Sequence, residues 1–154
     1  MVSDQREWLI LVADDSADDR MFIRNALHAV APKVRVSETV DGIDTLAYLR
    51  GAAQPFPDLL LLDLKMPRMD GLETLAEIRG DPGLRHLPVI AIFTTATDPE
   101  FVRRAYASGV NAYVGKPSTL GELKVLMEVL VRHWFEIATL PSHAQLTAAR
   151  PNSH

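Results

Sequence analysis

Residues 59–63, Leu59-Leu60-Leu61-Leu62-Asp63, decide the fold. Four consecutive leucines are typical of a β-strand that is covered on both faces, and this run ends abruptly at a carboxylate. The segment Met66-Pro67-Arg68-Met69-Asp70-Gly71 indicates a loop, because Pro, Asp and Gly favour turns. A helical pattern then covers about 72–79. A buried strand, a loop and a helix in this order indicate one unit of an α/β sheet.

The same alternation of apolar runs and helical patterns extends in both directions from this stretch. Upstream, the apolar run Trp8–Ala13 and alternating valines at 34, 36 and 40 predict two strands. Downstream, 89–93 and 111–114 predict two more. The other helices are expected at about 21–30, 43–49, 99–107 and 118–137. Five strands alternating with five helices predict a doubly wound, five-stranded parallel sheet with helices on both faces.

Length and composition fit one globular domain. The 154 residues are 47% hydrophobic and 23% charged, ordinary values for a chain that folds around its own core. Residues after Pro141 are small and polar, which predicts a frayed tail. We expect an N-terminal extension at 1–6, a domain at 7–137 and a C-terminal tail at 138–154.

Several classes of protein are excluded by what the sequence lacks. Without cysteine there is no disulfide framework, thiolate nucleophile or cysteine-ligated metal. A net charge of −4 gives no reason to expect a nucleic-acid partner. No run approaches the ~20 apolar residues that span a bilayer, and the polar start of the chain is not a signal peptide. We therefore expect a soluble, cytoplasmic protein with no membrane partner.

Charged and hydroxyl side chains occur where the predicted strands end, the edge at which parallel sheets place their functional sites. These residues are Asp14, Asp15, Asp63, Thr94, Thr95 and Lys116. Three neighbouring carboxylates repel one another, which favours a bound divalent cation, and Mg²⁺ prefers carboxylate and phosphate oxygens. A carboxylate is also a nucleophile that can form an aspartyl-phosphate. Phosphoryl transfer needs mostly positioning and neutralisation of the transferred oxygens, which a metal ion, a lysine and a hydroxyl donor would supply.

Each of these residues, taken singly, has a simpler structural explanation. An acidic pair after a strand is usually a helix cap, Asp63 could also be a cap, Thr94 and Thr95 could belong to the strand, and Lys116 could be a solvated charge. Their joint placement at the ends of four different strands favours a functional site.

These residues occur in motifs that resemble the receiver domain of two-component response regulators, over about residues 7–137. The motifs are LVADD at 11–15, LDLKMPRMDG at 62–71 with Pro67 and Gly71 shaping the loop, the pair Thr94-Thr95, and YVGKP at 113–117. The resemblance implies a flavodoxin-like fold with strand order 2-1-3-4-5. It implies a phosphoacceptor that takes its phosphoryl group from a phosphohistidine of a sensor histidine kinase, and not a conventional enzyme.

The resemblance also assigns a role to each acidic residue. Asp63 would be the phosphoacceptor. The ligands of Mg²⁺ would be Asp14, Asp15, Asp63 and the backbone carbonyl of Lys65.

The remaining motif residues would bind the phosphoryl group and respond to it. Thr94 would donate a hydrogen bond to one phosphoryl oxygen, and Lys116 would pair with another. Thr95 is an alternative to Thr94, because the segment after Pro88 is one residue longer than usual. Tyr113 matches the aromatic residue that turns inward on phosphorylation. The Lys116-Pro117 bond is expected to be cis, as it commonly is in receivers.

The last predicted helix carries a second candidate surface. Its apolar stripe, expected in the core, consists of Leu120, Leu123, Leu126, Met127, Leu130, Trp134 and Ile137. Val125 and Val129 lie off this stripe and Phe135 lies on a third side, which favours a contact with another protein.

The run 133–141 resembles the C-terminal extension of small receivers that pair with phytochrome-type histidine kinases. That resemblance implies a homodimer, with Val125, Val129, Trp134 and Phe135 as interface candidates, and a light-sensing kinase as partner. Residues 138–154 are too few for a DNA-binding module, so we expect a stand-alone receiver whose output comes from protein contacts.

Three other functions are compatible with the same fold. The first is a dimeric, receiver-like binding module that works without phosphate, which the intact Asp63, acidic pair and Lys116 disfavour. The second is a phosphatase with Asp63 as nucleophile, disfavoured because Lys65 stands where a second acid is usual. The third is flavin binding, disfavoured because the loop at 14–19 is acidic where phosphate needs free donors.

Overall fold

The computed structural model describes residues 7–52, 55–93 and 98–141. Their strands form one parallel sheet in the order β2-β1-β3-β4-β5. The strands are β1 (Leu9–Ala13), β2 (Arg35–Thr39), β3 (Leu59–Asp63), β4 (Val89–Phe93) and β5 (Ala112–Gly115). The predicted flavodoxin-like α/β fold is confirmed.

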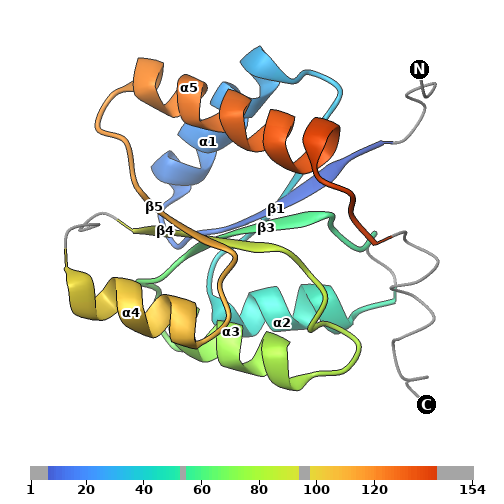
Figure 1. Ribbon diagram of the computed structural model, residues 1–154, viewed down its shortest axis with the longest axis vertical. Coiled ribbons are helices and arrows are strands. Elements are labelled where there is room, and N and C mark those ends of the chain that lie inside the picture. The colour runs from blue at the N-terminus through green and yellow to red at the C-terminus, as the bar shows by residue number, and fades with distance from the viewer. Residues whose placement is uncertain (1–6, 53–54, 94–97, 142–154) are drawn as a thin grey trace.

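The helices form one layer on each face of the sheet (Figure 1). They are α1 (Ala17–Val30), α2 (Gly42–Arg50), α3 (Gly71–Gly80), α4 (Pro99–Ala107) and α5 (Leu120–Val131), followed by the π-helical segment η1 (Arg132–Ile137). Helices α1 and α5 cover one face, and α2, α3 and α4 cover the other. No helix in these described ranges is long and apolar enough to cross a membrane.

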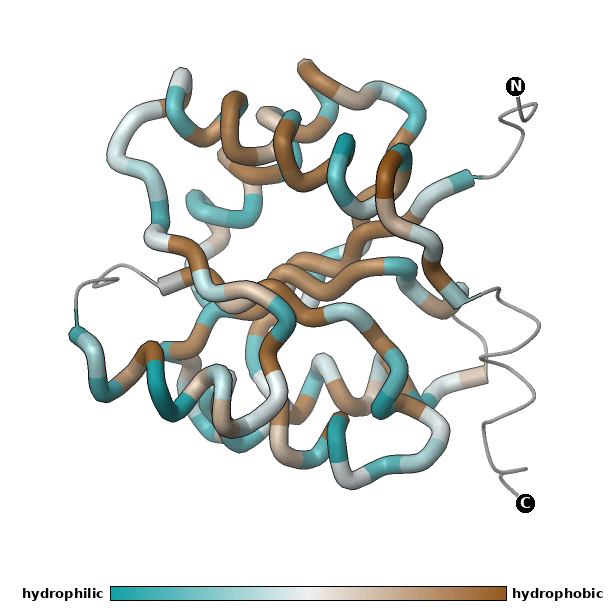
Figure 2. Tube along the Cα trace, viewed as in Figure 1, coloured by the Kyte–Doolittle hydropathy of each residue, from teal (hydrophilic) through white to brown (hydrophobic). Residues whose placement is uncertain are grey.

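The central strands are apolar throughout because both of their faces are buried. Side chains alternate between the faces of a strand, so successive residues of β3 enter different cores. Leu60 and Leu62 pack with α2, α3 and α4, whereas Leu59 and Leu61 pack with α1 and α5. Figure 2 shows this apolar centre as a brown band between the helices.

Capping side chains place the helices directly after the ends of the strands. Ser16 accepts a hydrogen bond from the backbone of Asp19 and begins α1, and Asp41 begins α2 in the same way. Asp70 and Glu73 form a capping box at the start of α3. Short polar segments therefore separate each strand from its helix at the carboxyl edge of the sheet.

The last helix differs from the prediction of one helix over 118–137. It begins after Thr119, and beyond Val131 the backbone widens into the π-helical η1, where the Ala138 N–H donates to the His133 carbonyl at 2.7 Å. A π turn holds more residues than an α turn, so the 100° stripe does not continue. Leu123, Met127 and Leu130 are buried as expected, whereas Leu120 and Ile137 are exposed, and their placement in the core was wrong.

Candidate functional site

Three carboxylates lie together at the carboxyl edge of the sheet. Asp63 is the last residue of β3, and Asp14 and Asp15 follow β1, the neighbouring strand. One oxygen of each carboxylate lies within 4.8 Å of the other two. Asp14 and Asp63 are buried, and Asp15 is exposed. The parallel register brings together residues that lie about fifty positions apart in the chain.

The loop after β3 presents backbone groups to Asp63. The Lys65 N–H donates to Asp63 Oδ1 at 3.1 Å. Gly71 N–H donates to the Leu64 carbonyl at 3.1 Å, and a Cβ on Gly71 would overlap the Asp63 carbonyl oxygen. Only glycine therefore lets α3 start so close to the end of β3. Pro67 accepts a hydrogen bond from the Met69 N–H at 2.7 Å within the same loop.

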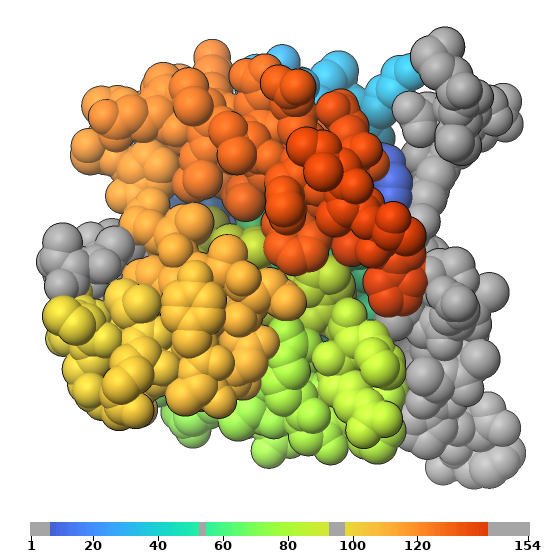
Figure 3. Space-filling model, viewed as in Figure 1, coloured from blue at the N-terminus to red at the C-terminus, as the bar shows by residue number. Residues whose placement is uncertain are grey.

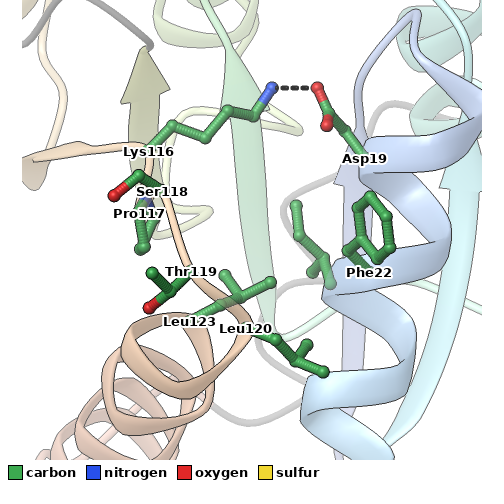
Figure 4. Close-up of a pocket in the computed structure, with 9 residues that line it drawn as sticks. Asp19, Phe22, Lys116, Pro117, Ser118, Thr119, Leu120 and Leu123 are labelled. Carbon is green, nitrogen blue, oxygen red and sulfur yellow. Dashed lines mark hydrogen bonds and ion pairs between the residues drawn. The ribbon is translucent and has the colours of Figure 1, made fainter.

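Lys116, directly after β5, contacts two of the three carboxylates, those of Asp14 and Asp63. Its Nζ donates to Asp14 Oδ2 at 2.8 Å and lies 3.8 Å from Asp63 Oδ2. A second hydrogen bond, 2.7 Å long, runs to Asp19 Oδ2 in the first turn of α1 (Figure 4). Sequence reasoning missed Asp19, although its position in the helix that follows the Asp14-Asp15 pair was a usable signal.

The negative charges around Asp63 outnumber the positive charge of Lys116. Burial and, to a smaller extent, the nearby carboxylates of Asp14 and Asp15 raise the pKa of Asp63 to about 6, although the Lys65 N–H and Lys116 act to lower it. Burial lowers the pKa of Lys116, but its hydrogen bonds to Asp14 and Asp19 outweigh this and raise it to about 12. The lysine is therefore charged, and the site still holds more negative charge than Lys116 neutralises.

The three-carboxylate cluster fits a hard divalent cation. Carboxylate oxygens are the ligands that Mg²⁺ prefers, and Asp14, Asp15 and Asp63 supply three within mutual reach. Burial and the two neighbouring carboxylates raise the pKa of Asp63, so its ionised form is disfavoured in this site. A cation bound there would favour the ionised, nucleophilic form of Asp63.

Some predicted site residues behave differently or lie outside the described ranges. Thr94 and Thr95 are among the residues that are not described. The Lys116–Pro117 bond is trans, so the prediction of a cis bond was wrong. Trans is the lower-energy isomer of an X–Pro bond, and with it Lys116 already reaches Asp14 and Asp19.

Tyr113 lies in β5, half-buried, with its backbone N–H donating to the Tyr106 hydroxyl at 3.2 Å. Its own hydroxyl is buried and finds no hydrogen-bond partner within the described residues. Burial and the nearby Asp98 carboxylate raise the pKa of Tyr113.

The four interface candidates divide into two pairs. Val125 and Val129 on α5 are 61% and 57% exposed. Trp134 and Phe135 in η1 are partly buried against the chain's own core, and Phe135 stacks on Trp8 with ring centroids 4.4 Å apart. Figure 3 shows α5 and η1 forming one continuous surface region above α4.

The model of the response regulator receiver domain matches residues 10–128. The chain belongs to this family. The family consists of receiver domains and not of conventional enzymes, and the acidic cluster of Asp14, Asp15 and Asp63 is consistent with an aspartyl-phosphate site.

Individual receivers resemble the chain over most of its length. The probable methanogenesis regulatory protein FilR2 of Methanothrix harundinacea is 35% identical over 130 residues, which cover 82% of this chain and 83% of FilR2. The response regulator Rcp1 of Synechocystis sp. is 32% identical over 138 residues, 87% of this chain and 93% of Rcp1.

Solved structures of two such receivers superpose well. The phosphorylated cyanobacterial phytochrome response regulator RcpA has a TM-score of 0.83 at 35% identity, with 89% of this chain and 100% of RcpA covered. The Mn²⁺-bound form of Rcp1 has a TM-score of 0.79 at 32% identity, with 88% and 99% covered. The chain therefore resembles receivers whose structures include a phosphorylated and a metal-bound form.

Proposed function

We propose that this receiver accepts a phosphoryl group on Asp63 from a phosphohistidine of a sensor histidine kinase, in a reaction that requires Mg²⁺. The observation that carries the proposal is the gathering of Asp14, Asp15 and Lys116 around a buried Asp63. The phosphorylated form of RcpA and the Mn²⁺-bound form of Rcp1 support it by similarity.

The reaction moves one phosphoryl group from the kinase histidine to Asp63 and regenerates the free histidine. A carboxylate oxygen of Asp63 attacks phosphorus, a P–O bond forms, the P–N bond of the phosphohistidine breaks, and the imidazole leaves with the electron pair. Asp14, Asp15, Asp63 and the Lys65 carbonyl would hold Mg²⁺, which supplies positive charge to the transferred oxygens. The Lys116 ammonium supplies the second positive charge.

Thr94 would donate a hydrogen bond to a phosphoryl oxygen, with Thr95 as the alternative donor. Tyr113, whose hydroxyl lacks a partner within the described residues, would follow that threonine inward. These movements would change the surface formed by α4, β5 and α5, and output would come from protein contacts on that surface.

Phosphorylation is tested with acetyl phosphate and Mg²⁺, followed by intact-mass measurement. The wild type should gain one phosphoryl group, and Asp63→Asn or excess chelator should prevent the gain completely. Asp41→Asn, which removes another buried carboxylate at the same edge of the sheet, is the matched control and should still be phosphorylated. An unmodified wild type would contradict the proposal and favour a phosphate-independent dimeric module.

We propose a phytochrome-type kinase as the partner, because Rcp1 and RcpA resemble the chain and RcpA is a phytochrome response regulator. FilR2 resembles it at similar identity and is named for another process, so the experiment must compare kinases directly. Phosphotransfer profiling against the host's purified histidine kinases should show the fastest transfer from a light-sensing kinase. Faster transfer from another kinase would contradict this assignment.

We also propose a homodimer that uses α5 and η1. Val125 and Val129 are exposed apolar residues one helical turn apart, which suits a contact with a second copy. Size-exclusion chromatography with light scattering should give a dimer at micromolar concentration, and Val125→Lys combined with Val129→Lys should give a monomer. Ile43→Lys on α2 changes an equally apolar exposed residue and should leave the dimer intact. A monomeric wild type would refute the proposal.

A further inference from the structure

The Lys116 ammonium is shared among carboxylates from three elements. Its hydrogen bonds to Asp14 and Asp19 measure 2.8 and 2.7 Å, whereas Asp63 Oδ2 lies 3.8 Å away, beyond hydrogen-bond length. An ammonium has three N–H donors, so these two bonds use most of its capacity. In this arrangement Lys116 lies close to Asp63 but does not donate a hydrogen bond to it.

Asp19 is placed to compete for Lys116 by the way α1 begins. Ser16 caps α1 by accepting a hydrogen bond from the Asp19 backbone N–H at 3.2 Å, so Asp19 lies in the first turn of the helix that follows β1. The ion pair is partly shielded from water, since the Lys116 side chain is mostly buried. It borders a pocket of about 240 Å³ between α1 and the segment 116–123, with Phe22 and Leu120 among its apolar lining (Figure 4).

Asp18 offers a direct comparison within the same helical turn. It is exposed, and in the part of the chain that the structure describes it makes no ion pair with Lys116. Asp18 and Asp19 therefore carry the same charge at nearly the same distance along α1, but only Asp19 contacts the lysine.

We propose that Asp19 is a positioning residue that holds Lys116 in the unphosphorylated protein and opposes its engagement with the phosphoryl group. The inference rests on the proposed phosphorylation of Asp63. A phosphoryl group brings about −1.5 to −2 charges and three acceptor oxygens, so it draws the ammonium away from Asp19. The Asp19–Lys116 bond is then present in one state only, and it stabilises the unphosphorylated state relative to the other.

The test measures binding of beryllium trifluoride, a stable phosphoryl analogue, to the full chain in Mg²⁺ by calorimetry. Asp19→Asn should bind the analogue about fivefold more tightly than the wild type, since a shielded charge pair no longer has to break. Asp18→Asn, with the same change of charge, should bind within about twofold of the wild type, and Asp19→Glu should restore wild-type affinity. Equal tightening by Asp18→Asn and Asp19→Asn would overturn the proposal, because it would indicate general charge repulsion.

A second measurement needs neither metal nor analogue. A double-mutant cycle of Asp19→Asn and Lys116→Met in unfolding experiments on the metal-free protein should show favourable coupling between the two side chains. The same cycle with Asp18→Asn should show none. Absence of coupling for Asp19 would overturn the proposal even if the affinities differ.

Phosphorylation of Asp63 and the role of Asp19 can be refuted separately. A wild type that neither binds the analogue nor gains a phosphoryl group refutes the proposed function, and the inference with it. A wild type that does both, with an unchanged affinity for Asp19→Asn, refutes the role of Asp19 alone.

Discussion

Asp41 and Asp63 are both buried carboxyls at the carboxyl edge of the sheet, yet their environments shift their pKa values in opposite directions. Asp41 is 3% exposed and caps α2 just beyond β2, and Asp63 is 8% exposed at the end of β3. The pKa of Asp41 lies below its usual value of 3.8, and that of Asp63 is raised to about 6. Burial alone therefore does not decide the charge of a carboxyl.

The balance between burial and hydrogen bonding differs at the two carboxyls. Burial is the largest cause of the raised pKa of Asp63, whereas at Asp41 the hydrogen bond from the Asp44 N–H is the largest cause and, together with Arg68, outweighs burial. Asp41 accepts from the Asp44 N–H at 2.8 Å and from the Arg68 guanidinium at 2.7 Å. Asp63 accepts from one backbone N–H, has Lys116 at 3.8 Å, and faces two other carboxylates. Asp41 is fully partnered, as a structural carboxylate should be. Asp63 has no positively charged group within hydrogen-bond distance among the described residues, which suits a residue that acts together with a cation.

Arg68 joins the two regions. It follows Asp63 on the loop after β3, and its φ of 65° lies in the left-handed region that non-glycine residues seldom adopt. Its guanidinium pairs with Asp41, and the Gly42 N–H donates to the Met69 carbonyl at 3.1 Å. The structural carboxylate thus anchors the loop that follows the functional one.

The largest expected effect on stability comes from a substitution that displaces the backbone beside Asp63. Gly71→Ala should lower the free energy of unfolding by about 3 kcal/mol, because the added Cβ overlaps rigid backbone at the end of β3. Gly80→Ala in the same helix is the control, since a Cβ there meets nothing within 4 Å and should not destabilise the protein. Urea unfolding measures both. Equal stability of the two variants would show that α3 can shift away from β3 freely.

The next largest effect concerns how the ionisation of Asp63 makes the stability of the fold depend on pH. Because its pKa is higher in the folded protein than the usual 3.8, Asp63 stabilises the metal-free fold fully below pH 4, and this contribution is lost as pH rises through 6. Asp63→Asn lacks this loss, so its stability relative to the wild type should increase by about 2–3 kcal/mol between pH 4 and pH 8. A stability difference that stays constant with pH would contradict the raised pKa.

Mg²⁺ provides the matching control for Asp63. At pH 8 the ion should raise the unfolding temperature of the wild type, because a ligand that binds only the folded state stabilises it. The increase should be much smaller for Asp63→Asn.

The smallest expected effect on stability concerns Asp41, whose pKa is shifted in the opposite direction to that of Asp63. Its lowered pKa means that the ionised form stabilises the fold above pH 3.8, and that this contribution is lost as pH falls further. Asp41→Asn keeps a capping side chain but loses the charge pair with Arg68, so it should cost about 1 kcal/mol at pH 7, a modest value because Arg68 is exposed. The cost should shrink between pH 4 and pH 2. A cost that grows on acidification would overturn the comparison.

The sequence by itself determined the class of the fold and the residues that gather at the carboxyl edge of the sheet. The leucine run that ends in Asp63, together with the other short apolar runs, was enough to predict a parallel sheet, because strands buried on both faces need continuous apolar residues. The rule that functional groups collect at the carboxyl ends of strands then identified Asp14, Asp15, Asp63 and Lys116 as neighbours. The strand order, which makes β1 and β3 neighbours, came from the resemblance to receiver domains, and with that order the carboxylate cluster could be predicted.

Only the tertiary structure decided how the side chains divide their partners. Lys116 pairs with Asp19 and not with Asp18 because of the rotational position of α1. Asp41 pairs with Arg68 because the loop before α2 lies beside the loop before α3. The widened turn of η1, which directs Phe135 onto Trp8, and the trans Lys116–Pro117 bond also escaped prediction. Periodicity sets the face on which a residue lies, but distances of a few ångströms between charged atoms depend on how whole elements pack.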